Sequence, residues 1–167
     1  FWNLEKDIAY HLKRLLQGNN YFVANDFEEK IKKAETKQGF QFTQEQIDGI
    51  KLGIEKQVCV ISGLAGSGKS SLVTGILSVL DEYTFAQCAL SGNAAARLQE
   101  VTGKEGFTIH RLLGYTGGCG FSYGEDNPLP YDIIILDEVS MVGGEIFLDL
   151  IRAIPTGSKL LMLGDMG

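Results

Sequence analysis

VCVISGLAGSGKS, residues 58–70, joins a short apolar run to a glycine-rich loop that ends in a lysine and a serine. The apolar run is typical of a strand buried in a parallel sheet, and the loop fits the phosphate-loop pattern GxxxxGK[ST]. Glycines let backbone N–H groups converge on phosphates at the positive end of the following helix. We expect Lys69 to reach the β- and γ-phosphates of ATP and the Ser70 hydroxyl to bind Mg²⁺. The whole expected nucleotide-binding loop comprises Gly63, Ala65, Gly66, Ser67, Gly68, Lys69, Ser70 and Ser71. The alternative, a chance glycine-rich turn, is disfavoured by the strand before the loop and the helix after it.

A second motif, ILDEVSM at residues 135–141, ends an apolar run in two adjacent carboxylates. At the carboxyl end of a strand beside the phosphate loop, Asp137 would hold Mg²⁺ through water. Glu138 would orient or deprotonate the water that attacks the γ-phosphate. An acidic helix N-cap is the alternative interpretation. Adjacent Asp and Glu favour nucleotide hydrolysis over transfer by a kinase, so we predict Lys69, Asp137 and Glu138 as the catalytic residues.

The flanking sequence alternates between strand and helix patterns. Apolar runs at residues 85–90, 133–136 and 159–163 predict strands, and helical patterns occupy 93–101, 108–113 and 144–154. This alternation predicts an α/β fold in which helices flank a parallel sheet. The segment 114–130 is rich in glycine and carries aromatic residues without a helical period. It predicts a surface excursion or a short accessory β-hairpin.

The first 41 residues have a different character from the rest of the chain. Helical spacing predicts one helix at residues 1–17 and another that begins after Asn25, with Glu28 completing a capping box. Residues 36–41 resemble a linker. We therefore divide the chain into a helical segment with its linker, 1–41, and an α/β domain, 42–167. The first residue is Phe1, and Gly167 falls in what looks like an active-site loop, so we expect a piece of a longer protein.

FTQEQ, residues 42–46, opens the α/β domain. Thr43 and Gln46 have the spacing of a capping box at the start of a helix. The Gln46 carboxamide can also donate to and accept from the edge of an adenine ring. Both interpretations of Gln46 stay open on the residues alone.

The bulk composition narrows the functional classes. With 167 residues, 44% hydrophobic and 22% charged, the chain suits a globular domain with a full core. A net charge of −6 counts against a dedicated basic nucleic-acid binder, although not against a local binding groove. We see neither a signal peptide nor a run of the ~20 apolar residues that span a bilayer. Cys59, Cys88 and Cys119 fit neither a zinc site nor a redox pair, and we expect reduced thiols in a cytoplasmic protein, two of them in the core.

The chain resembles the RecD-like helicases, superfamily-1 motors akin to the exodeoxyribonuclease V alpha subunit that move 5′→3′ on single-stranded DNA. The resemblance covers residues 42–167 and rests on FTQEQ, GLAGSGKS, ALSGNAAARLQEVTG (89–103), TIHRLLGY (108–115), NPLPYDIIILDEVSMV (127–142) and LMLGD (161–165), in that order. It implies the first RecA-like phosphate-loop NTPase domain of an enzyme that unwinds DNA in recombination or repair. It also implies ATP and Mg²⁺ as cofactors, and as partners single-stranded DNA, a second motor domain of the same protein, and a nuclease complex, with no membrane association.

The resemblance assigns further roles to particular residues. Gln46 would read adenine, and Asp165 would couple the γ-phosphate state to the grip on DNA. Single-stranded DNA would lie along Ser91, Asn93, Arg97, Thr108 and His110. The family commonly has Thr-Gly-Arg where this chain has Ser91-Gly92-Asn93, which weakens one expected DNA contact. From the residues alone, a solvated helix arginine is the default interpretation of Arg97, and His110 is more often structural than catalytic.

Two rival functions stay open at this point. The first is a phosphate-loop ATPase that remodels partners other than nucleic acid, and the second is a degenerate nucleotide-sensing scaffold. The intact Lys69, Asp137 and Glu138 disfavour the scaffold. Tyr115, Phe121 and Tyr123 would stack on bases or else pack within the hairpin. Because the arginine finger and later motifs of a second motor domain are absent, we expect the chain alone to hydrolyse ATP weakly.

Overall fold

The computed structural model describes residues 2–63 and 68–165. Its strands are β1 (Val58–Gly63), β2 (Phe85–Ala89), β3 (Gly106–Thr108), β4 (Ile133–Leu136) and β5 (Lys159–Asp165). Its α-helices are α1 (Trp2–Leu16), α2 (Phe27–Gln38), α3 (Gln44–Glu55), α4 (Lys69–Val79), α5 (Gly92–Thr102), α6 (Ile109–Leu112) and α7 (Gly144–Arg152). Two 3₁₀ turns are η1 (Gly117–Cys119) and η2 (Val139–Met141).

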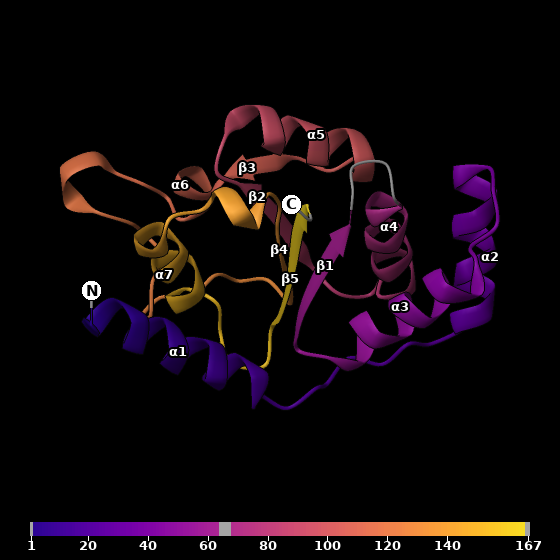
Figure 1. Ribbon diagram of the computed structural model, residues 1–167, viewed down its shortest axis with the longest axis horizontal. Helices are drawn as coiled ribbons and strands as arrows, with labels where there is room; N and C mark the ends of the chain where they lie inside the picture. Colours follow the sequence, from indigo (N-terminus) through magenta and orange to yellow (C-terminus); the bar gives the residue numbers. More distant parts are fainter. Residues whose placement is uncertain (1, 64–67, 166–167) are drawn as a thin grey trace.

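The strands form a parallel sheet in the order β1-β5-β4-β2-β3 within the described part of the chain (Figure 1). The register aligns Gly63 of β1 with Asp165 of β5, and Leu136 of β4 with Met162 of β5. All the strands therefore end at one edge of the sheet, where the loops that bear the motifs emerge. In open parallel sheets this edge is where ligands bind.

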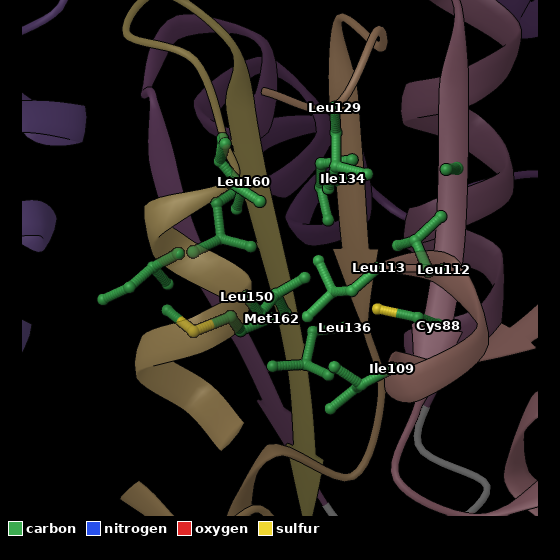
Figure 2. Close-up of a cluster of buried hydrophobic side chains, with 14 of the residues drawn as sticks. Cys88, Ile109, Leu112, Leu113, Leu129, Ile134, Leu136, Leu150, Leu160 and Met162 are labelled. Atoms are coloured by element: carbon green, nitrogen blue, oxygen red, sulfur yellow. The ribbon is translucent and has the colours of Figure 1, made fainter. Parts of the chain in front are cut away.

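Two hydrophobic clusters cover opposite faces of the sheet because successive strand residues point to opposite sides. Ile134 and Leu136 of β4 face a cluster with α1, α6 and α7, in which Leu150 and Met162 also take part (Figure 2). Ile133 and Ile135 face α3, α4 and α5. The sequence prediction of a parallel sheet flanked by helices is confirmed.

Close packing of α3 on α4 depends on two glycines. A Cβ at Gly53 would overlap Ile76, and a Cβ at Gly75 would overlap Ile50. Each helix thus receives the isoleucine of the other, and both isoleucines are fully buried. This packing fixes the direction of α4, which begins at Lys69.

The first two helices brace the sheet from opposite sides. Helix α1 packs along α7 (Figure 1), where Arg14 donates to the carbonyls of Ile151 (3.0 Å) and Ile154 (2.9 Å). Helix α2 packs on α4, and Lys30 pairs with Asp81 at 2.8 Å. The segment between them passes the amino ends of the strands. The N-terminal segment therefore contributes to the packing of both faces.

Several local expectations need correction. The capping box predicted at the start of α2 is wrong: Asp26 precedes the helix with φ 55° and its side chain makes no capping bond. The helix also runs to Gln38, which shortens the predicted linker. Strand β3 was not predicted from the sequence. In the excursion at 114–130, the expected hairpin is reduced to isolated antiparallel bridges, Tyr115 with Phe121 and Gly124 with Asn127.

Candidate ATP site

A cavity of about 320 Å³ opens at the carboxyl edge of the sheet, between the start of α4, the end of β4 and one side of α5. Its volume is at the lower end of the range for small-molecule pockets. Its polar and charged lining residues are Lys69, Ser70, Arg97, Glu100, Asp137 and Glu138. Lys69 and Asp137, one from each motif and 68 positions apart in the chain, thus line the same cavity.

Lys69 is the first residue of α4, directly after Gly68, whose φ of 93° lies in the left-handed region that favours glycine. The Lys69 ammonium donates to the carbonyl of Gly164 in β5 at 3.2 Å. This contact holds the lysine over the sheet edge, with Ser70 beside it in the cavity lining. Of the predicted loop residues, Ala65, Gly66 and Ser67 lie outside the described residues.

Gln46 lies against the end of the phosphate loop. Its side-chain oxygen accepts from the Thr43 N–H at 2.9 Å, and the Thr43 hydroxyl accepts from the Gln46 N–H at 3.1 Å, so the predicted capping box at α3 is confirmed. The Gln46 Nε2 atom is 2.9 Å from the position that a Cβ on Gly68 would take. The capping bond therefore leaves its NH₂ group facing the loop.

Asp137 follows β4 at the same edge, with β5 between its strand and β1. Its N–H donates to the Cys88 carbonyl at 2.9 Å, and its carboxylate accepts from the Glu138 N–H at 2.8 Å. Burial raises the pKa of Asp137, and the neighbouring Glu138 adds to that effect, whereas the Glu138 N–H, Lys69 and Arg97 lower it. A carboxylate and the Ser70 hydroxyl in one cavity are oxygen ligands of the kind Mg²⁺ prefers, so these residues fit the predicted metal.

Glu138 has φ 53°, an uncommon conformation for a residue other than glycine. Its carboxylate forms an ion pair with the Arg97 guanidinium. The family resemblance predicts a place for Arg97 along the DNA track, and in the structure Arg97 lines the cavity beside the acidic pair. No pattern in the sequence links these two residues, which lie on different elements.

The other residues predicted along the DNA track lie near the carboxyl ends of β2 and β3. The Ser91 hydroxyl caps α5 by accepting from the Ala94 N–H, and the Thr108 hydroxyl caps α6 by accepting from the Arg111 N–H, both at 3.2 Å. Asn93 is exposed, and so is His110, whose ring meets Tyr115 edge-on at 5.6 Å between centroids. Tyr115 is 55% exposed, whereas Phe121 and Tyr123 pack against the core.

Comparisons with known proteins identify the family of the chain. A family model described as AAA domain matches residues 46–167. The ATP-dependent RecD2 DNA helicase of Deinococcus radiodurans is 41% identical over 111 residues, covering 65% of this chain and 15% of that protein. The RecBCD enzyme subunit RecD of Mycobacterium tuberculosis is 30% identical over 146 residues, covering 72% of this chain and 25% of that protein. The chain thus spans between about a seventh and a quarter of the length of these two relatives.

Solved helicase structures share the fold. Bacteroides Pif1 bound to single-stranded DNA superposes with a TM-score of 0.51 and 25% identity, covering 74% of this chain and 32% of that one. Pif1 helicase from Candida albicans gives a TM-score of 0.52 and 26% identity, with the same coverage. Among residues 2–63 and 68–165, no helix is long and apolar enough to cross a membrane.

Proposed function

The chain belongs to the AAA domain family and resembles the RecD-like superfamily-1 helicases, and on that premise we propose that it is the ATP-binding and ATP-hydrolysing motor domain of a DNA helicase. In this proposal residues 42–167 are the first motor domain, and residues 1–41 are the helical segment before it. The parent enzyme translocates 5′→3′ on single-stranded DNA and unwinds duplex DNA.

One observation carries the proposal: the lysine of the phosphate loop and the adjacent carboxylates line the same cavity. A structural interpretation of either motif alone, as a glycine-rich turn or an acidic helix cap, gives no reason for this convergence. Names of the relatives and structural neighbours support a helicase over a remodeller that acts on other partners.

Each residue has a distinct proposed task. Lys69 neutralises the β- and γ-phosphates, and the start of α4 directs its N–H groups at them. Mg²⁺, held by Ser70 and Asp137, would withdraw charge from the same phosphates. Glu138 orients and deprotonates the attacking water. The Gln46 NH₂ group faces Gly68 at the end of the phosphate loop, and this position supports a role for Gln46 in reading adenine.

The proposed partners follow from the same relatives. Single-stranded DNA would cross the surface that carries Asn93, His110 and Tyr115, near the carboxyl ends of β2 and β3. A second motor domain would close over the ATP and supply an arginine finger. The naming of relatives as RecBCD subunits supports a nuclease complex as the setting of the parent enzyme. We also propose that the protein acts in the cytoplasm.

The test separates binding from hydrolysis. We expect the chain to bind Mg-ATP and to hydrolyse it slowly, because an arginine finger is worth ~10³–10⁵ in rate. Lys69→Ala should lower ATP affinity by at least about tenfold, since it removes a charge-assisted contact to phosphate. Glu138→Gln should retain binding and lose turnover. Glu105→Gln is the matched control, because Glu105 also pairs with an arginine but lies outside the cavity.

A second arm tests the nucleic-acid partner. Binding of oligo-dT should weaken steeply as salt rises, because phosphate contacts release counterions. Unchanged ATP affinity in Lys69→Ala would refute the ATP site. Nucleotide binding without any oligo-dT binding would favour the remodeller.

A further inference from the structure

Arg97 lies in the ATP cavity and pairs with the residue proposed to activate water. Its guanidinium contacts the Glu138 carboxylate, and the two side chains are 62% and 31% exposed. Lys69, Glu100 and Asp137 are the other ionisable groups in the lining. Arg97 is therefore the one arginine among the described residues of this cavity.

The orientation of Arg97 follows from the packing of α5. Ala94, Ala95 and Leu98 are buried against the sheet. With 3.6 residues per turn, this leaves Arg97 and its helical neighbours Glu100 and Val101 on the side that borders the cavity. The helix start is fixed by the Ser91 cap, so Arg97 has a defined position beside the end of β4.

We propose that Arg97 is a γ-phosphate ligand that Glu138 holds in place while the site contains no nucleotide. This inference rests on the proposed function, because it needs ATP to occupy the cavity. When ATP binds, the guanidinium transfers from the Glu138 carboxylate to the γ-phosphate oxygens. The transfer releases Glu138 to orient water at the moment when a γ-phosphate is present.

The relative strengths of the two pairings favour this exchange. A pair as exposed as Arg97 and Glu138 is worth no more than about fivefold in an equilibrium constant. The γ-phosphate offers more negative charge, and its oxygens match the planar guanidinium for two parallel hydrogen bonds. ADP lacks that group, so it leaves Arg97 on Glu138.

Affinities for ATP and ADP, measured with Mg²⁺ by fluorescence titration, test the proposal without relying on turnover. Arg97→Ala should lower the affinity for ATP about tenfold and change the affinity for ADP by less than about twofold. Arg97→Lys should recover part of the loss, since it keeps the charge without the planar fork. Arg111→Ala is the matched control, because Arg111 is similarly exposed and paired with Glu105 at 3.0 Å, outside the cavity.

A double-mutant cycle tests whether Glu138 holds Arg97. Glu138→Gln frees the guanidinium in advance, so it should tighten ATP binding about three- to fivefold. In an Arg97→Ala background this gain should be severalfold smaller. Circular dichroism checks that each variant keeps the wild-type fold.

Three results would overturn the proposal. Equal weakening of ATP and ADP by Arg97→Ala would mean a general electrostatic or structural effect. An equal gain from Glu138→Gln in both backgrounds would mean simple relief of repulsion between carboxylate and phosphate. If Arg97→Ala lost oligo-dT binding but kept its ATP affinity, Arg97 would be assigned to the DNA surface. A wild-type chain that binds neither nucleotide would instead refute the proposed function itself.

Discussion

Replacing the buried Lys159 by methionine should alter how stability depends on pH. Lys159 begins β5 and is fully buried. Its ammonium donates to the carbonyls of Ile54 (3.1 Å) and Lys56 at the end of α3, and lies 4.7 Å from the centre of the Phe22 ring. Burial lowers the pKa of Lys159 to about 8, from 10.5.

The sign of the effect follows from proton linkage. Between pH 8 and 10.5 the folded protein has lost the Lys159 proton, whereas the unfolded chain still holds it. The contribution of Lys159 to the free energy of unfolding therefore increases as pH rises through this window, by about 3 kcal/mol in total. Below pH 8 Lys159 is protonated in both the folded and the unfolded state, and the free-energy cost of burying its charge in the folded state is at its maximum.

Other groups act in the opposite direction at alkaline pH. Burial raises the pKa of Cys88 to about 12, and burial together with the Asp132 hydrogen bond raises the pKa of Tyr21 to about 12. Both groups ionise earlier in the unfolded chain, so their contribution to stability declines as pH rises. Because wild type and variant share these groups, the difference between the two isolates Lys159.

Urea unfolding at a series of pH values measures that difference. The free energy of unfolding of Lys159→Met, minus that of wild type, should fall by about 3 kcal/mol between pH 8 and 10.5. Lys56→Met is the control, since the Lys56 side chain is exposed and only its carbonyl meets Lys159. A difference that stays flat from pH 7 to 10.5 would show that Lys159 is not charged and buried as described.

Three further substitutions probe packing, capping and DNA contact. Gly75→Ala should lower the free energy of unfolding by about 1–2 kcal/mol, because its Cβ would overlap Ile50, and a melting temperature equal to wild type would contradict this packing. Thr43→Ala should cost about 0.5–2 kcal/mol in urea unfolding, since it removes the α3 cap, and an unchanged midpoint would argue against the capping box. Tyr115→Ala should weaken oligo-dT binding at least about fivefold, because the exposed Tyr115 ring can stack on a base whereas the half-buried Tyr123 ring is too enclosed to do so. Unaltered oligo-dT binding would assign Tyr115 to hairpin packing.

The motif-bearing elements could be predicted because local sequence determines them. The apolar runs of β1 and β4 precede polar loops, and the predicted bounds of β4, 133–136, match the structure. The Thr43 cap needs only residues three positions apart. Strand β3 escaped prediction because it has only three residues and pairs along one side with β2. Nothing in so short a segment distinguishes a strand from a loop.

Contacts between distant parts of the chain account for what the sequence could not reveal. A lysine at the start of an apolar strand normally reaches solvent, and the carbonyls that bury Lys159 come from α3, about a hundred positions earlier. The environment of Arg97 likewise depends on which element borders α5. Helical spacing identifies Ala94 and Leu98 as its buried side, but it does not show that the carboxyl end of β4 borders the adjacent side, which carries Arg97.

The position of Arg97 links the two functions that the motifs suggested separately. Helix α5 begins at Gly92, between its cap Ser91 and Asn93 on the surface proposed for DNA, and about one turn later it presents Arg97 to the ATP cavity. Because an α-helix is stiff over a single turn, a change in the pose of its start also moves the guanidinium relative to Glu138. DNA bound at the start of α5 would thereby bias the exchange of Arg97 between Glu138 and the γ-phosphate. Coupling of this kind is reciprocal for binding. In the wild type, ATP should therefore raise the affinity for oligo-dT by the same factor by which oligo-dT raises the affinity for ATP. In Arg97→Ala that factor should approach one, and a factor equal to that of the wild type would show that the coupling takes another route.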